Sequence, residues 1–409
     1  MKARKLLTAV SGAMLLGASG VSSAATWQAG DWTLGLGGNI NTFFTNTFCD
    51  AGDIDNGGTY AGLACAASGG DDVSNVSNGL LPASLNFSAS TNQDGWDIGA
   101  NINVYYNLTS EGVDTGLPGD ALDFSTVDPR QVYMTFGKDD FGTFKLGRDF
   151  GLFAFDAIIN DMSLIGVGAT FVAENPGHTT LGGLGFGYPY TDRLAQMNYT
   201  TPNMNGLTGT LGIMQGLDAN QAGTEALNDG VGYHGKLAWS GDMGGTSVSL
   251  SGTFINYDVD VTTATGTGTE SVQGFDLFGK VGFGNFSALA YYFNGEGMTS
   301  LALGGLVLPG FDAVGTPEEV DGYMLQGTYT MGKTRFGINW SENEFDQISV
   351  HENQKLTLGI YYNLTASLQL LAEYSMMESE IPAGSAMSLS GLAESDETEA
   401  LAIGAILFF

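Results

Sequence analysis

Charged residues are scarce in this chain, and basic residues are the scarcest of all. Only 14% of the 409 residues are charged, below the roughly 25% of an ordinary soluble domain. The 13 basic residues stand against 44 acidic ones, a formal net charge of −31. Such a charge repels phosphate and excludes a nucleic-acid-binding protein. Hydrophobic content is nevertheless 43%, which is too high for a disordered chain.

Long apolar runs and a helical composition are also missing. Beyond the first 25 residues, no stretch approaches the ~20 apolar residues of a membrane-spanning helix. Glycine, with 62 residues, is too frequent for a mainly helical protein. The composition therefore predicts an all-β protein with many turns.

Cysteine and histidine are few. Cys49 and Cys65 lie close together in a Gly- and Asp-rich segment, and in an exported protein such a pair predicts one disulfide. The three histidines form no HExxH motif and no visible triad pattern. We therefore expect no catalysis, no metal site and no cofactor.

The N-terminus indicates export. Basic residues in 1–5 precede a short apolar stretch over 6–21, and small residues end at Ala24 and Ala25. This pattern predicts a secretory signal peptide over residues 1–25. Its removal takes away three basic residues, which leaves 10 basic against 44 acidic residues and a net charge of −34. Residues 26–409 are expected to form a single domain.

Alternation of apolar with small or polar residues predicts strands. It is clear over 356–362 and over 401–409. Short Gly/Asn/Asp turns separate pairs of strands, and eight longer polar segments lie near 48–79, 110–126, 151–190, 217–229, 257–272, 296–319, 344–352 and 378–396. Eight long loops and seven short turns give sixteen strands. Short turns on one side and long loops on the other are typical of an outer-membrane barrel.

Aromatic residues support this interpretation, because barrels carry girdles of amphipathic rings at both membrane interfaces. Tyr105, Tyr106, Tyr291 and Tyr292 all lie near predicted strand ends. The last residue, Phe409, closes an alternating strand and resembles the signal read by the outer-membrane barrel assembly machinery.

Two neighbouring segments carry a family resemblance. Residues 130–137 are followed by the sequence FGTFKLGR at 141–148, and then by the long segment 151–190. This order resembles the general porins of Gram-negative bacteria, whose long third extracellular loop folds into a 16-stranded antiparallel barrel and narrows the pore. The resemblance implies a homotrimer that passes ions and small hydrophilic solutes by passive diffusion.

The resemblance also implies a constriction in which acids of the third loop face arginines of the barrel wall. Arg130 and Arg193 match two wall arginines, and Asp161 matches a loop acid. Further candidates are Lys145, Arg148, Asp156 and Glu174. Arg130 shares its parity with Val132 and Met134, so it is expected at a strand end or beside a β-bulge.

The acidic excess predicts a weak preference for cations, because negative mouths enrich them and salt screens the effect. Outer-membrane lipid, lipopolysaccharide and the barrel assembly machinery are the other expected partners. Three alternatives remain open: a solute-specific channel lined by Phe153, Phe155 and Phe171, a plugged structural barrel, and a barrel enzyme.

Overall fold

The computed structural model of this protein describes most of the chain beyond the predicted signal peptide. The described residues are 25–49, 60–65, 71–106, 128–170, 180–221, 224–264, 266–298, 315–346, 352–380 and 395–409. Within these ranges, no helix is long and apolar enough to cross a membrane. The predicted signal peptide lies outside the described residues except for Ala25.

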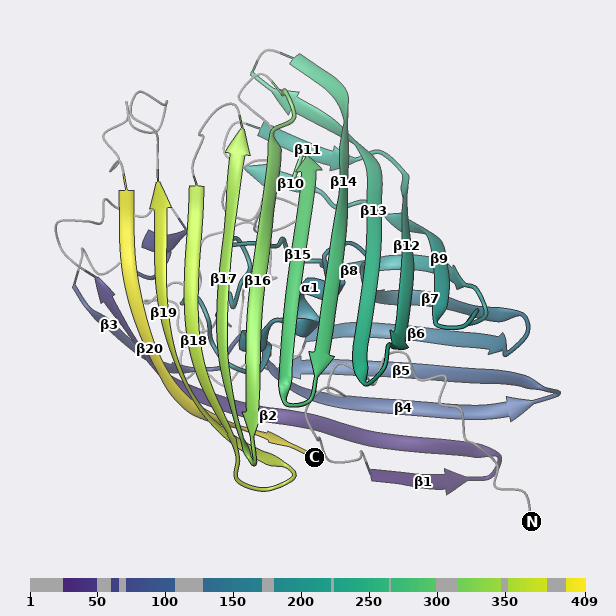
Figure 1. Ribbon diagram of the computed structural model, residues 1–409. Coiled ribbons are helices and arrows are strands. Elements are labelled where there is room, and N and C mark those ends of the chain that lie inside the picture. The colour runs from purple at the N-terminus through teal and green to yellow at the C-terminus, as the bar shows by residue number, and fades with distance from the viewer. Residues whose placement is uncertain are drawn as a thin grey trace.

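Sixteen of the described strands close into one antiparallel barrel, as the sequence predicts (Figure 1). The first and last strands complete the circle, in a register that runs from Asn39 opposite Phe408 to Cys49 opposite Thr398. The barrel strands are β2 (Trp32–Cys49), β4 (Ala83–Gln93), β5 (Trp96–Tyr106), β6 (Asp128–Lys138), β7 (Gly142–Phe150), β8 (Arg193–Thr200), β9 (Leu207–Gln215), β12 (Val231–Asp242), β13 (Thr246–Thr263), β14 (Gly266–Phe283), β15 (Phe286–Glu296), β16 (Glu319–Met331), β17 (Thr334–Asp346), β18 (Glu352–Asn363), β19 (Leu368–Glu380) and β20 (Ser395–Phe408).

Four short strands extend this sheet at its edges. β1 (Ala25–Ala29) and β3 (Val73–Ser77) pair with β2, while β11 (Thr224–Asn228) pairs with β13 and with β10 (Ala219–Gln221). These additions lie beyond the barrel's continuous ring and leave its strand order unchanged.

The period-two pattern sorts side chains onto two faces, as it must in a pleated strand. On β18 the outward Leu358 and Ile360 are 43% and 49% exposed, whereas the inward Lys355 and Thr357 are buried. Large apolar side chains are exposed in the same way on most of the other strands. An apolar outer face around a polar interior is the arrangement that a membrane requires of a barrel.

One predicted loop is wrong. Residues 257–272 are not a long loop, because β13 and β14 pair without a break from Tyr257 opposite Val272 to Thr263 opposite Gly266. Tyr257, Val259 and Val261 alternate there with polar residues and are buried. The carboxylates on the other face accept hydrogen bonds from hydroxyls of the neighbouring strand, and these polar residues hide the strand pattern in the sequence.

The predicted disulfide is confirmed. Cys49 and Cys65 are joined, with Cα atoms 5.9 Å apart. The bond holds the short helix η2 (Ala61–Ala64) against the barrel wall, where Ala61 donates to Ser379 Oγ at 3.0 Å and accepts from Thr398 Oγ1 at 3.0 Å. The first loop is therefore tied to β19 and β20.

The closing seam between β2 and β20 depends on a close approach at Gly404. A Cβ atom there would lie 2.3 Å from both the carbonyl oxygen of Thr42 and Cδ1 of Phe43. We expect Gly404→Val to lower the free energy of unfolding by about 1–3 kcal/mol, the usual cost of overpacking. Urea unfolding of the folded barrel in detergent, followed by tryptophan fluorescence, measures this change.

Gly268 on β14 is the matched control, because a Cβ atom there meets nothing within 4 Å. Gly268→Val should unfold at the urea concentration of the unaltered protein. Equal unfolding midpoints for the two variants would contradict a sterically tight seam.

Candidate functional site: the lumen and the third loop

The third loop follows β7 and runs inside the barrel, where Figure 1 shows its helix α1. It contains α1 (Phe155–Asn160) and the short helix η4 (Met162–Ile165). Its apolar residues Phe153 and Ala157 are fully buried, and the ring of Phe153 packs edge-on against Phe293 of β15 at 6.4 Å. Burial of this apolar face draws the loop onto the wall rather than leaving it in solvent.

Polar anchors fix the loop's backbone along one side of the wall. Asp276 of β14 accepts from the Ala154 N–H at 2.6 Å. Gln326 of β16 accepts from the Met162 N–H at 2.7 Å and donates to the Asn160 carbonyl at 2.9 Å. These bonds satisfy backbone groups that would otherwise be buried without partners.

Glu373 of β19 anchors the loop further along the chain. Its Oε2 accepts from the N–H groups of Val167 and Gly168, both at 2.8 Å. Its Oε1 accepts from the Tyr361 hydroxyl at 2.6 Å. The Thr47 hydroxyl of β2 donates to Thr170 at 2.9 Å and extends the attachment.

Asp161 is buried inside the loop and takes no part in lining open space. It is 4% exposed, caps η4 by accepting from the Ser163 N–H at 2.9 Å, and accepts from the Tyr188 hydroxyl at 2.5 Å. Burial, together with the Asp161 carboxylate, raises the pKa of the Tyr188 phenol well above its ordinary value. Tyr188 therefore remains a donor, and the pair joins the two arms of the loop.

Asp156 of the third loop lies at the lumen, beside the wall. It forms an ion pair with Lys236 of β12 at 2.6 Å and accepts from the Ser251 hydroxyl of β13 at 2.5 Å. The loop and the wall thus meet in a direct charge pair rather than across open space.

Arg130 and Arg193 are brought together by a shared carboxylate. Asp128 Oδ2 lies 2.8 Å from Arg130 Nε and 2.9 Å from Arg193 Nη1. The expected bulge is present, because the β5–β6 register shifts between Asn103 and Tyr105. The described carboxylate partners of these arginines are Asp128 and Asp192, not the third-loop acids Asp156 and Asp161.

Lys145 points inward on β7 and pairs with Asp149 at 2.5 Å. Gln131 of β6 donates to the same carboxylate at 2.7 Å. Arg148 has the opposite parity: it is exposed and lies opposite the outward Val132. The prediction that Arg148 lines the constriction is therefore wrong, because period two places it on the outer face. Glu174 lies outside the described residues.

Several inward charges were not anticipated. Lys236, Lys280, Arg335 and Lys355 occupy inward strand positions, as do Asp276 and Glu373. Strand parity could have identified them. Each lies next in sequence to an apolar residue of the outer face, and neighbouring residues of a strand point to opposite faces. Lys355, for example, precedes the outward Leu356.

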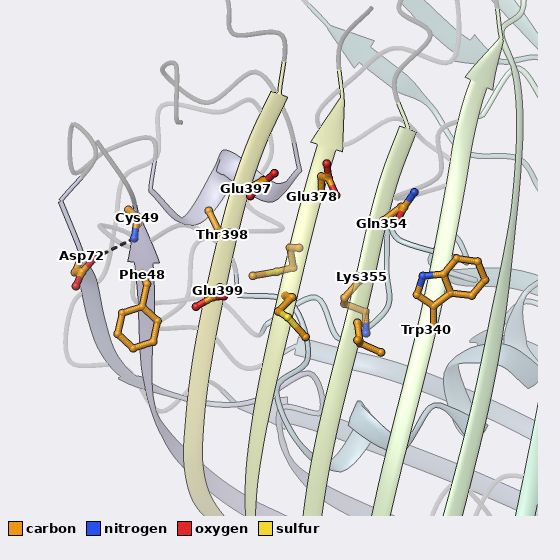
Figure 2. A pocket seen from close by; sticks show the side chains of 13 residues that line it. Phe48, Cys49, Asp72, Trp340, Gln354, Lys355, Glu378, Glu397, Thr398 and Glu399 are labelled. Carbon is orange, nitrogen blue, oxygen red and sulfur yellow. Dashed lines mark hydrogen bonds between the residues drawn. The ribbon is translucent and has the colours of Figure 1, made fainter. Parts of the chain in front are cut away.

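The acidic excess of the described strands lies mostly on the outer face near the extracellular ends. Glu378 of β19 stands directly opposite Glu397 of β20, and Figure 2 shows both beside Glu399 around a groove. Phe48, Trp340, Leu356 and Met376 also line this groove, which lies on the outer side of the wall, apart from the lumen. Among the described residues, no group of three or more His, Cys, Asp or Glu side chains is placed to hold a metal ion.

A closed sixteen-stranded barrel with an apolar exterior and a polar lumen is an outer-membrane channel. A family model for the Gram-negative porins matches residues 9–381, and the protein belongs to that family. The family consists of passive channels of the outer membrane, not enzymes. Comparison of the sequence with curated proteins finds no match.

Solved structures share the fold. The outer-membrane channel DcaP of Acinetobacter baumannii matches with a TM-score of 0.67 at 13% identity, over 94% of this chain and 100% of that one. The anion-selective porin from Comamonas acidovorans matches with a TM-score of 0.61 at 15% identity, over 92% and 100%. A trimer form of OmpT from Vibrio cholerae matches with a TM-score of 0.50 at 15% identity, over 92% and 99%.

Loss of the Glu373 anchor should loosen the third loop. Glu373→Leu removes the acceptor of three hydrogen bonds, each worth about 0.5–1.5 kcal/mol. We expect larger open-channel current fluctuations in planar bilayers, with Glu373→Gln intermediate because its amide oxygen still accepts.

Glu378→Gln, on the outward face of the same strand, serves as the control and should leave the current noise unchanged. A Glu373→Leu channel as quiet as this control would mean that the carboxylate does not hold the loop.

Proposed function

We propose that this protein is a passive diffusion channel for ions and small hydrophilic solutes, narrowed by its third loop. The observation that best supports this proposal is the set of hydrogen bonds that anchor loop residues 154–170 to β14, β16, β19 and β2. The opposite wall presents polar side chains to a cavity lined by Ser88, Asn101, Thr135, Lys145, Asn198 and Thr210, among others. Solute is expected to pass between the loop and this wall.

The constriction roles of the candidate residues are part of this proposal. Asp156 and Lys145 are the candidates whose side chains reach the lumen from the loop and from the wall. Arg130 and Arg193 would act at the rim, where Arg193 stands opposite the last residue of β7, Phe150. Asp161 would act indirectly, by holding the loop in shape.

A solute-specific channel with an aromatic lining is less well supported. Phe153 is fully buried against Phe293, and Phe155 packs against Phe150 at 5.9 Å. Phe171 lies outside the described residues. The described loop aromatics therefore contact protein rather than forming a continuous surface for sugar rings.

The proposed assembly is a homotrimer in the outer membrane, supported by the trimeric OmpT neighbour. Lipid would cover the apolar outer face. Lipopolysaccharide, bridged by divalent cations, would meet the outer carboxylates. Phe409 is proposed as the signal for the barrel assembly machinery; its backbone exchanges two hydrogen bonds with Gly38 at 2.9 and 3.1 Å, which places it at the closing seam.

The channel should prefer cations weakly and in a salt-dependent way. The carboxylates of the described strands lie mostly near the extracellular ends, whereas inward lysines offset the acids of the lumen. We expect a cation-directed reversal potential under a KCl gradient near 0.1 M that falls close to zero near 1 M, because the Debye length shrinks from about 10 to about 3 Å.

Lys145→Gln provides the comparison inside the lumen, because it removes a positive charge there. This variant should prefer cations more strongly than the unaltered channel does, and the difference should persist near 1 M, since partly buried charges are screened less. Anion preference of the unaltered channel near 0.1 M, or a reversal potential independent of salt, would contradict selectivity at the mouths.

A further inference from the structure

A cavity of about 760 Å³ lies between the third loop and the wall, toward the end of the barrel that carries the short turns. Residues of those turns, Gly206, Gly284 and Asn285, line it on that side, while Asp156 and Asn160 of α1 line it on the other. A solute that has passed the loop toward the periplasm would enter this cavity.

Hydroxyl groups are the commonest polar side-chain groups of its wall. They come from inward positions of four strands, β9, β13, β15 and β16: Thr208, Ser247, Ser249, Ser287, Thr328 and Thr330. Each hydroxyl can donate one hydrogen bond and accept others. The surface therefore suits a ligand that carries several oxygen atoms.

The charge of this lining is positive, in contrast to the chain as a whole. Lys236 and Lys280 line the cavity, and Asp156 is the only carboxylate among its lining residues. Lys236 is neutralised by Asp156 at 2.6 Å. Lys280 Nζ donates to the neutral Asn160 Oδ1 at 2.9 Å, and no described carboxylate lies within ion-pair distance. An ammonium group has three donors, so Lys280 retains both charge and donors for a ligand.

A second cation without a carboxylate partner among the described residues lies beside the cavity, at an inward position of the next strand. Arg335 of β17 stands opposite Thr330, one of the lining hydroxyls. Its guanidinium packs over the Tyr361 ring at 4.3 Å, and its buried Nε and Nη2 have no hydrogen-bond partner among the described residues. No described salt bridge includes it. Its charge adds to the positive potential around Lys280, and the potential is strengthened by low-dielectric walls.

We propose that this cavity is a binding site for a small oxyanion, a carboxylate, phosphate or sulfate group, held by Lys280 and the surrounding hydroxyls. A free cation would be repelled from it, and a neutral sugar would leave the Lys280 charge unmatched. The site rests on the proposed channel function and deepens it, because it names a class of solute that the lumen retains. The carboxylates near the extracellular ends act on solutes that approach from outside, whereas this site acts beyond the loop.

Sulfate block of the KCl current tests the site. The KCl conductance of each channel is read first and reports the channel function by itself. Sulfate then replaces chloride on the periplasmic side at constant ionic strength. We expect a saturable fall in current, and a half-blocking concentration about tenfold higher in Lys280→Gln, as for the loss of one charge-assisted hydrogen bond. Lys280→Arg, which keeps the charge, should restore most of the block.

Lys333→Gln is the matched control, because it removes one positive charge from a short turn, where Lys333 donates to the Leu364 carbonyl. It should leave the block unchanged, and glucose at the same concentration should not block. The proposal is overturned if Lys280→Gln and the unaltered channel respond alike, if Lys333→Gln weakens the block equally, or if glucose blocks as sulfate does. Absence of KCl conductance would instead contradict the channel function.

Discussion

Backbone pairing in hydrocarbon is the constraint on which this structure depends. No water reaches the membrane core, so every peptide group there needs a partner within the protein, and a sheet meets that demand only by closing. The pairing of β2 with β20 removes the last free edges. Closure also creates a lumen, and the third loop occupies it by burying Phe153 and by giving its backbone N–H groups to Asp276 and Glu373.

Charge is distributed by the same geometry. Strand parity places carboxylates such as Glu378 and Glu397 on the outside, near the extracellular ends. It places Lys145, Lys236 and Lys280 inside, beside Asp149, Asp156 and Asn160. A chain with a large negative charge can therefore place in its lumen a cation, Lys280, that has no carboxylate partner among the described residues. Net charge alone is thus a poor guide to what the interior of a barrel binds.

The sequence was sufficient for the barrel because alternation, turn residues and loop lengths all reflect local backbone geometry. It failed at 257–272, where Asp258 and Asp260 are outward strand residues whose polarity resembles that of a loop. The match to the porin family predicted Arg148 at the constriction, which is wrong. Arg148 has the same strand parity as Leu146, and this parity indicates the outer face. The family match put Asp161 among the constriction acids, but its burial could not be predicted, because that burial depends on Tyr188, 27 residues further along the chain. Contacts of that kind leave no periodic trace in a sequence.

The most direct test is the single-channel conductance of the unaltered protein compared with a variant in which residues 152–190 are replaced by a short Gly/Ser linker. An open lumen narrowed by the third loop predicts that the unaltered channel conducts and that the variant conducts severalfold more. Equal conductances would show that the loop does not narrow the pore. A closed channel that opens only when the loop is removed would show that the loop is a plug.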